Sequence, residues 1–365
     1  MRFLRTAHAW AGTVLSALLC VLGASGALLI FKADYLRLAV PEARQAASLA
    51  PEDLGPVLEA AEARFAGEGL RYVAVAEPGF GLHKAVFNDG GGAYLSGDGE
   101  VVARWAKNGR AEDWLFDLHH YLLMGNAGKT VAGIAGVAAL VLVVTGIVIV
   151  WPSLRAFAWR VWPRSGARRD LVAQHRDLGI IFAAPILILV FCGVSMVFSG
   201  PVRSLIYAAT LSKPSPALER PQAGEGAVDW TKALAAAYAA YPNSPPRIVS
   251  FAPKPGASAS LRLRQPAEWH QNGRTYVYID PATSAVLATS NAQDLSRGDR
   301  VFNALYPIHS SGIGGKLYEI AAFLTGLALT ALGAIGTWTF LVRQQRGLKS
   351  RAQKRRSATA SFRGS

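Results

Sequence analysis

Four stretches of the sequence contain no Asp, Glu, Lys or Arg and are long enough to cross a lipid bilayer. A helix that spans the hydrocarbon core needs about 20 mostly apolar residues, and each stretch meets that length. The stretches cover residues 6–31, 130–154, 178–202 and 320–342. The sequence therefore predicts an integral membrane α-helical protein with four transmembrane helices.

Two blocks of ordinary polarity, residues 32–118 and 203–316, lie between the first and second spans and between the third and fourth. Each block begins with a helix-like stretch and continues with strand-like runs, which predicts a small α+β unit. The predicted helices cover 51–66 and 230–241, and the predicted strands cover 70–76, 83–88, 100–103, 247–252, 260–264 and 275–279.

The placement of positive charge predicts the side of the membrane on which each segment lies. The formal net charge is +14. Three segments carry basic residues but no acidic one: the stretch with Arg2 and Arg5 before the first span, the loop 155–169 and the tail 343–365. Four crossings put these three segments on one side, which the positive-inside rule makes cytoplasmic. Block 32–118 carries 14 acidic and 9 basic residues, so the charge indicates topology and not nucleic-acid binding.

The chain also repeats itself, because the order of span, block and span occurs twice. In equivalent spans, a histidine lies at the same distance in sequence from a glycine. In three of the spans a small residue (Ser25, Thr145 or Cys192) precedes this glycine, and in the fourth Ile335 precedes it. The distance is 18 residues for His8–Gly26 and His175–Gly193, and 27 residues for His119–Gly146 and His309–Gly336. These spacings predict a tandem parallel duplication that includes the first span, so we expect that span to be retained and not cleaved as a signal peptide.

A parallel repeat places equivalent residues at equal depth on opposite sides of an axis along the membrane normal. We therefore expect His8 to face His175 near the cytoplasmic surface, and His119 to face His309 near the external surface. Two facing imidazoles at each of two depths suit two six-coordinate haem irons. The sequence has no CxxCH segment, so the expected cofactors are two b-type haems, bound non-covalently by paired histidines.

Simpler interpretations of the histidines stay open at this point. A single histidine near a helix end is often only an interfacial polar residue. His120 misses the repeat register by one residue, which favours His119 as the ligand, and Met124 is a weak alternative ligand. His83 and His270 lie in the polar blocks, where we expect them at the surface.

The span entries resemble those of the PepSY-associated transmembrane (PepSY-TM) family. The resemblance rests on the segments HAWAG (8–12), LHHYL (118–122), QHRDLG (174–179) and PIHS (307–310), and on the turn DPAT (280–283) before the last span. It covers nearly the whole chain. This sequence departs from the family pattern at Ala9, where Arg is frequent, and at Ser284, where Gly is usual.

The resemblance implies two periplasmic PepSY-like domains in a protein of the bacterial inner membrane, with both termini cytoplasmic. It also implies that His8 and His175 bind one haem iron, and His119 and His309 the other. The expected division is 1–31 (N-terminus and first span), 32–118 (PepSY-like domain 1), 119–154 (second span), 155–174 (cytoplasmic Arg-rich loop), 175–202 (third span), 203–308 (PepSY-like domain 2), 309–342 (fourth span) and 343–365 (basic cytoplasmic tail).

Some family members resemble ferric-siderophore reductases. The expected function is therefore electron transfer from a cytoplasmic-side donor to a periplasmic acceptor, such as a ferric chelate or siderophore. The donor is expected to be a quinol, a soluble reductant or a flavoprotein, and no catalytic side chain is assigned. Four aromatic residues are candidates for contacts with the acceptor, although core packing is the commoner role of such residues: Trp105, Trp114, Trp269 and Tyr306.

Two other functions stay open. The blocks could bind a peptide or protease in a membrane-anchored regulatory protein without redox activity. Transport of iron through the helices fits least well, because no span carries an ionisable Asp, Glu, Lys or Arg that could line a polar path.

Overall fold

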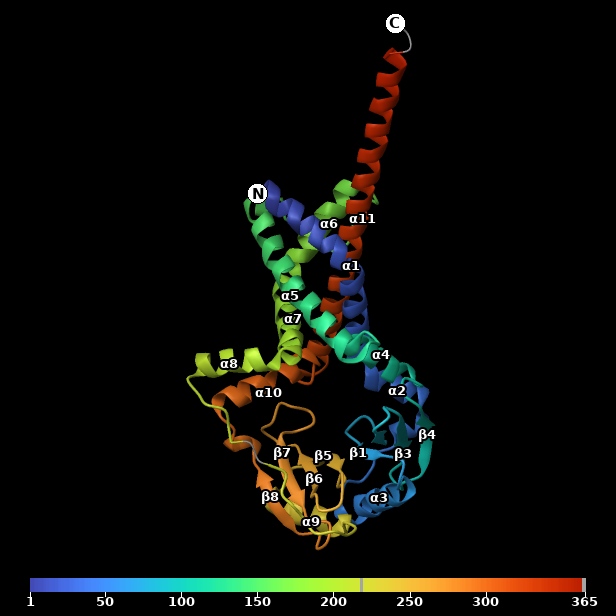
Figure 1. Cartoon of the computed structure of the whole chain (residues 1–365), viewed down its shortest axis with the longest axis vertical. Coiled ribbons are helices and arrows are strands. Elements are labelled where there is room, and N and C mark those ends of the chain that lie inside the picture. Colours follow the sequence, from blue (N-terminus) through green and yellow to red (C-terminus); the bar gives the residue numbers. More distant parts are fainter. Residues whose placement is uncertain (217–218, 363–365) are drawn as a thin grey trace. The chain divides into compact units, whose positions relative to one another are not determined.

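The computed structural model describes residues 1–216 and 219–362, and its contacts divide the chain into two compact units. The helical unit comprises residues 1–30, 118–197 and the chain from Lys316 onward. The sheet unit comprises residues 31–117 and 198–315. Figure 1 shows long helices in the first unit and a sheet with short helices in the second.

The helical unit contains α1 (Arg2–Ile30), α5 (Gly125–Val150), α6 (Arg168–Ile181), α7 (Ala183–Val197) and α11 (Gly315–Phe362), with the short 3-10 helix η2 (Trp151–Ala156) after α5. Among the described residues, three helical segments are long and apolar enough to span a membrane: Arg2–Ile30, Gly125–Ala156 and Gly315–Gln345. The pair α6 and α7 passes the same criterion if its two bent helices count as one span. The chain is therefore a membrane-embedded protein.

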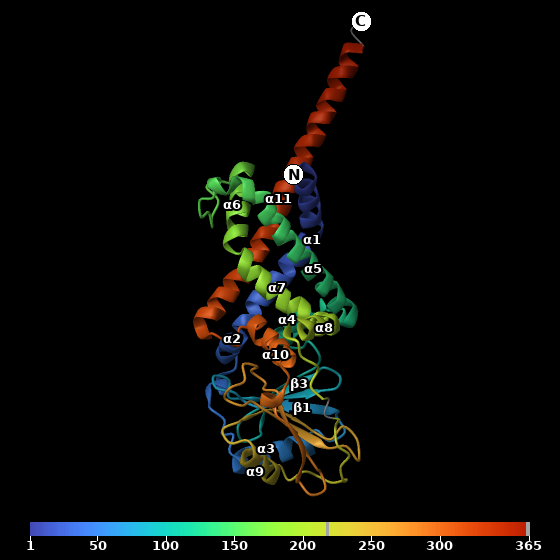
Figure 2. The same cartoon turned by 90° about the vertical axis from the view of Figure 1, so that its left-hand side faces the viewer.

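The third predicted span, 178–202, is not one straight helix. Helices α6 and α7 meet at an angle of 65° around Phe182, whose backbone leaves the helical region (Figure 2). Pro185 lies near the start of α7 and has no N–H to donate to the carbonyl of Ile181, where α6 ends. A proline that removes a bond to the residue four positions earlier commonly bends or breaks a helix at that point.

Small residues allow the membrane helices to approach closely. Leu19 of α1 and Ala135 and Ala139 of α5 are buried together in one cluster. On α1, a Cβ added to Gly23 would lie 2.8 Å from the backbone oxygen of Gly326 on α11. Glycine and alanine at such crossings permit the dispersion contacts that hold helices together in lipid.

The sheet unit is built on one antiparallel sheet of eight strands in the order β4-β3-β2-β1-β5-β6-β7-β8. Strands β1 and β5 pair antiparallel at the centre, with Val73 opposite Val249. The strands are β1 (Leu70–Ala74), β2 (His83–Phe87), β3 (Gly92–Leu95), β4 (Val101–Trp105), β5 (Pro246–Ser250), β6 (Ala259–Leu263), β7 (Thr275–Ile279) and β8 (Val286–Ser290). The two polar blocks, which we expected to form separate small units, therefore contribute half a sheet each.

Helices α3 (Pro51–Arg64) and α9 (Trp230–Ala240) lie side by side and share one buried cluster with the sheet (Figures 1 and 2). Their contact is so close that a Cβ added to Gly55 would overlap the side chain of Thr231 and lie 2.7 Å from its backbone nitrogen. The indole of Trp230 is fully buried and its Nε1 donates to Glu62 at 3.0 Å.

The predicted helices 51–66 and 230–241 are confirmed to within two residues at their ends. The six predicted strands are also present, whereas β3 and β8 were not predicted. Strand β3 has the sequence GAYL, and its short length and glycine start resemble a turn. Strand β8, VLATS, has only partly buried and exposed residues, so its apolar alternation is weak.

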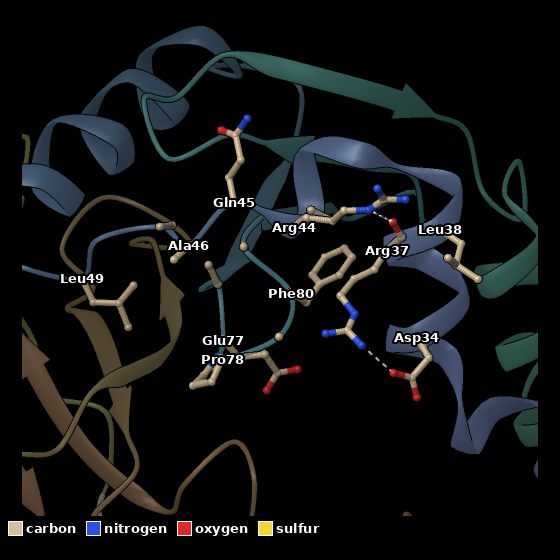
Figure 3. A pocket seen from close by; sticks show the side chains of 15 residues that line it. Asp34, Arg37, Leu38, Arg44, Gln45, Ala46, Leu49, Glu77, Pro78 and Phe80 are labelled. Atoms are coloured by element: carbon tan, nitrogen blue, oxygen red, sulfur yellow. Dashed lines mark hydrogen bonds and ion pairs between the residues drawn. The ribbon is translucent and has the colours of Figure 1, made fainter.

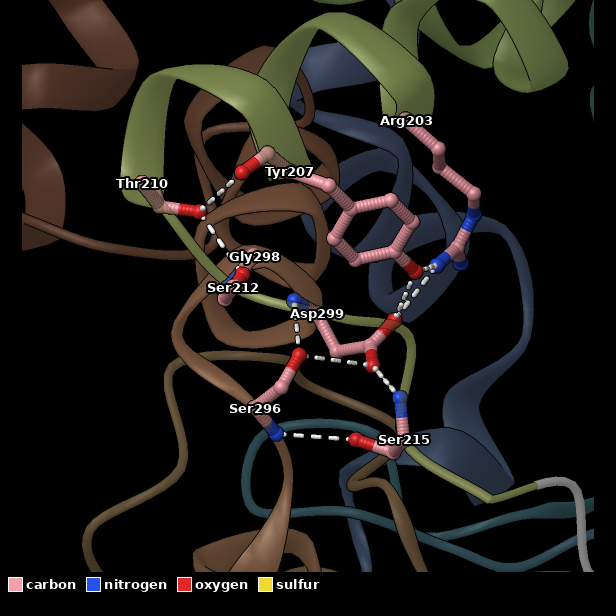
Figure 4. Close-up of polar contacts among 8 residues, drawn as sticks. All are labelled: Arg203, Tyr207, Thr210, Ser212, Ser215, Ser296, Gly298 and Asp299. Carbon is pink, nitrogen blue, oxygen red and sulfur yellow. Dashed lines mark hydrogen bonds and ion pairs between the residues drawn. The ribbon is translucent and has the colours of Figure 1, made fainter.

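Short helices not expected from the sequence complete the sheet unit: α2 (Lys32–Ala39), η1 (Pro41–Arg44), α4 (Ala111–Tyr121, which continues into the helical unit), α8 (Ser199–Thr210), η3 (Ala292–Asp294) and α10 (Arg297–His309). Asp299 of α10 joins α8 and α10, because it accepts hydrogen bonds from Tyr207 and Arg203 at 2.7 Å each (Figure 4). Burial alone would raise the pKa of Asp299, but hydrogen bonds from Tyr207, Ser215 and Ser296 lower it to about 2.

Candidate functional site

The helical unit brings two of the predicted histidine partners together. His8 lies on α1 and His175 on α6, and their ring centroids are 6.5 Å apart with an angle of 83° between the ring planes. The two residues are separated by most of two spans and the first polar block in the sequence. Their role as ligands stays a prediction, but they do face one another in one unit.

Each of these two histidines packs against a glycine of the repeat register on another helix. The Cε1 of His8 lies 3.4 Å from where a Cβ of Gly146 would be on α5. The Cε1 of His175 lies 3.5 Å from the same position of Gly336 on α11. Four helices therefore build the site: α1 and α6 each supply a histidine, and α5 and α11 each supply a glycine.

The 6.5 Å between the ring centroids of His8 and His175 is close to the separation of two imidazoles that bind one iron atom. Two such rings have centroids about 6 Å apart, because each metal–nitrogen bond is about 2 Å and each nitrogen lies about 1 Å from its ring centre. Among the described residues, no group of three or more His, Cys, Asp or Glu side chains could hold a metal ion. A two-histidine donor set suits an iron whose other positions are filled by a porphyrin.

His119 occupies a similar environment at another place in the helical unit. A Cβ on Gly26 of α1 would lie 2.8 Å from Cε1 of His119, and Ser25 Oγ lies 3.1 Å from its Nδ1. The ring of His120 is 5.3 Å from that of His119. The contacts to Ser25 and Gly26 belong to His119, which is the histidine that the repeat register favours. His309 ends α10 in the sheet unit, and its pairing with His119 stays a prediction.

The Arg-rich loop is fastened to α6 by an acidic residue that the sequence reasoning missed. Asp177 is fully buried, forms ion pairs with Arg160 at 3.2 Å and Arg176 at 2.6 Å, and accepts a hydrogen bond from the backbone N–H of Ala158. The same helix carries His175 two residues earlier. Asp177 therefore holds the loop against the helix that positions one candidate ligand.

His83 and His270 are not surface residues, contrary to our expectation. His83 on β2 is fully buried and its Nδ1 accepts a hydrogen bond from the backbone N–H of Ala76 at 3.1 Å. The buried ring of His270 stacks on Tyr306 with centroids 4.7 Å apart, and Arg274 Nη2 lies 2.9 Å from its Nε2. Both histidines therefore have structural roles in the sheet unit. The sequence offered no signal for this, because each follows a polar or turn-like stretch.

Acidification from pH 6.5 to 4 is expected to destabilise the sheet unit. Burial lowers the pKa of His83 to about 4, and burial together with Arg274 lowers the pKa of His270 to about 3. In this range the unfolded chain binds protons that the folded unit does not, so stability is lost as pH falls below about 6.5. Thermal unfolding at pH 7 and pH 4.5 would measure this loss. A His83→Gln variant should lose less between the two pH values, and an unchanged difference would contradict the assignment to His83.

The four aromatic candidates divide into two kinds. Trp105 is buried and its Nε1 donates to Asp113 at 2.6 Å, and Tyr306 stacks on His270, so these two belong to the interior of the sheet unit. Trp114 and Trp269 are exposed. The rings of these two are available to a ligand from solution.

The sheet unit also contains a cavity of about 580 Å³ that no sequence pattern indicated (Figure 3). Its walls include the side chains of Arg37, Arg44, Glu77 and Phe80. Arg37 forms an ion pair with Asp34 at 2.7 Å, and Arg44 Nε donates to the backbone oxygen of Arg37 at 2.9 Å. The cavity therefore brings the guanidinium groups of Arg37 and Arg44 together with the carboxylates of Asp34 and Glu77 beside the ring of Phe80.

Spanning helices and a sheet-bearing unit together define a membrane-embedded protein with a sheet domain. The chain belongs to the PepSY-associated TM region family, which it matches over residues 5–343. The match includes all four candidate histidines and confirms the resemblance seen in the span entries. No curated protein matches the chain.

Proposed function

We propose that this protein is an inner-membrane oxidoreductase that moves electrons from a cytoplasmic-side donor to a periplasmic acceptor. The acceptor is a ferric chelate or siderophore, and each Fe(III) reduced to Fe(II) takes one electron from the donor. Reduction weakens the hold of hard oxygen ligands on iron and so releases it. Two b-type haems, held by His8 with His175 and by His119 with His309, would supply the one-electron chemistry when bound.

The observation that carries the proposal is the site of His8 and His175. Two imidazoles lie at a separation that suits one iron, and each ring packs against a glycine of a further helix. The family membership and the repeat spacing point in the same direction. A purely anchoring role for the helices would require neither the facing rings nor the glycine at each ring.

The proposed topology has four spans, counting α6 and α7 as one bent span. Both termini and the Arg-rich loop are cytoplasmic, and the two PepSY-like blocks are periplasmic. The support is the distribution of positive charge: the loop 155–169 and the tail 343–365 contain no acidic residue. Attachment of a reporter to the end of the tail and to the loop between β7 and β8 would test it, since the two should report opposite sides.

The visible absorption spectrum of detergent-purified protein tests the cofactor. Protein from haem-replete cells should show a b-type spectrum with two axial histidines, and addition of dithionite should convert it to the reduced form. Colourless protein would overturn the proposal and favour a membrane-anchored regulatory protein that binds a peptide or protease.

We expect the cavity of the sheet unit to receive the acceptor if the acceptor is anionic. An Arg44→Gln variant should then be reoxidised roughly tenfold more slowly by an anionic ferric chelate, because a hydrogen bond from a charged donor contributes about 1.5–3 kcal/mol. Stopped-flow absorbance of the reduced protein measures the rate. Arg300→Gln is the matched control, because Arg300 is exposed and does not line the cavity.

Equal rates in the Arg44 and Arg300 variants would exclude the cavity as the acceptor site. Failure of every ferric chelate to reoxidise the reduced protein would remove the iron assignment and leave electron transfer to another acceptor.

A further inference from the structure

Hydroxyl groups contact two of the candidate ligands at Nδ1 of the imidazole ring. In the helical unit His8, His119 and His175 each pack with Cε1 on a register glycine, namely Gly146, Gly26 and Gly336. The residue before the glycine differs between the three places: Thr145, Ser25 and Ile335. Thr145 Oγ1 lies 2.9 Å from Nδ1 of His8, and Ser25 Oγ lies 3.1 Å from Nδ1 of His119.

The direction of these two hydrogen bonds follows from the other contacts of the hydroxyls. Thr145 Oγ1 donates to the backbone oxygen of Val141 at 2.8 Å, and Ser25 Oγ donates to that of Val21 at 2.6 Å. A hydroxyl has one proton, so an oxygen that donates it to a carbonyl can only accept from a second group. Nδ1 of each histidine therefore carries the proton, and Nε2 of the neutral ring keeps the lone pair that a metal needs.

The other histidine of the first site lacks such a partner. Nδ1 of His175 is buried and contacts no hydroxyl group; the neighbouring polar atom is the backbone oxygen of Leu332 on α11. The equivalent position of the repeat holds Ile335, which has no hydroxyl. The site of His8 and His175 thus joins one imidazole that has a hydroxyl at Nδ1 to one that has none.

We infer that Thr145 and Ser25 are positioning residues that fix the tautomer and orientation of His8 and His119, and that Ile335 leaves His175 without this support. The inference rests on the proposed function, because it concerns histidines as haem ligands. A hydroxyl oxygen that accepts a hydrogen bond from Nδ1–H makes the imidazole a stronger electron donor, which favours ferric over ferrous iron. The two histidines of one site would therefore contribute unequally to its reduction potential.

Holoprotein variants test the inference through the reduction potential. Thr145→Val removes the acceptor and should raise the potential, so that the ratio of reduced to oxidised haem at a fixed potential increases about fivefold, as expected for a hydrogen bond of about 1 kcal/mol. Thr145→Ser keeps the hydroxyl and should stay near the parent. Ile335→Thr supplies the absent hydroxyl and should change the ratio in the opposite direction.

Thr130→Val is the matched control, because Thr130 is an exposed threonine of the same helix whose hydroxyl only bonds the backbone of Asn126. Redox titration followed by visible absorbance measures all four variants, and the second haem, beside Ser25, serves as an internal reference. Equal potentials in the Thr145→Val and Thr130→Val proteins, or an Ile335→Thr protein that does not move in the opposite direction, would overturn the inference while haem remained bound. Protein that binds no haem would overturn the proposed function and the inference with it.

Discussion

Replacement of His175 by alanine is expected, on the proposed function, to remove one of the two proposed haems from the purified protein and to stop the proposed electron transfer to periplasmic acceptors. The ring centroids of His175 and His8 are 6.5 Å apart, and the described residues contain no group of three or more His, Cys, Asp or Glu side chains that could hold the metal instead. The haem content per protein should fall to about half. Pyridine haemochrome absorbance against protein concentration measures it.

The control for this variant is His120→Ala. His120 adjoins His119, but the contacts with Ser25 and Gly26 belong to His119, so both haems should be retained. Loss of haem from His120→Ala together with retention in His119→Ala would show that the repeat register selects the wrong histidine. Retention of both haems in His175→Ala would remove His175 from the ligand set.

Replacement of Gly55 by valine is expected to unfold the sheet unit at a much lower temperature. An added Cβ would overlap Thr231 and approach its backbone, which cannot move as a flexible side chain could. Separating α3 from α9 would open the buried cluster that both share with the sheet. We expect a loss of about 3 kcal/mol or more, which corresponds to a fall of about 10 °C in the midpoint for a unit of this size.

Ala60→Val is the matched control for Gly55→Val. Ala60 lies on the exposed side of α3, so it receives the same β-branched side chain without the contact to α9. Differential scanning fluorimetry or limited proteolysis of both variants measures the difference. Similar midpoints would show that helix propensity, and not the contact with Thr231, determines the effect.

Two features of the sequence predicted much of the architecture: the charge-free stretches, and the helix-like and strand-like runs of the two polar blocks. Charge-free stretches located the membrane helices, because lipid excludes unpaired charge over a length fixed by bilayer thickness. The bend between α6 and α7 was also readable in principle, since Pro185 stands inside the third stretch. The pairing of β1 with β5 was not, because strands so far apart in sequence are joined by tertiary packing and not by any local pattern.

The candidate site also has features that the sequence indicated and features that only the folded structure shows. The spacing of histidines and glycines indicated that His8 and His175 belong together, and the small residues before the glycines already marked Ser25 and Thr145. The sequence did not show that these hydroxyls contact the histidine rings, because the contacts join different helices. His83 and His270 were misjudged for a related reason: a histidine is equally compatible with a solvated surface and with a buried hydrogen-bonded position.

In the strand order β4-β3-β2-β1-β5-β6-β7-β8, each half of the sheet has its last strand at the outer edge and its first strand in the middle. Each block thus supplies a half-sheet whose first strand would be an unprotected edge if the block stood alone. Pairing of β1 with β5 covers both edges in one contact, as two copies of a half-length chain would by self-association around a twofold axis. One polypeptide that carries both half-sheets needs no such concentration-dependent assembly, and its two parts are free to differ in sequence, as Thr145 and Ile335 do.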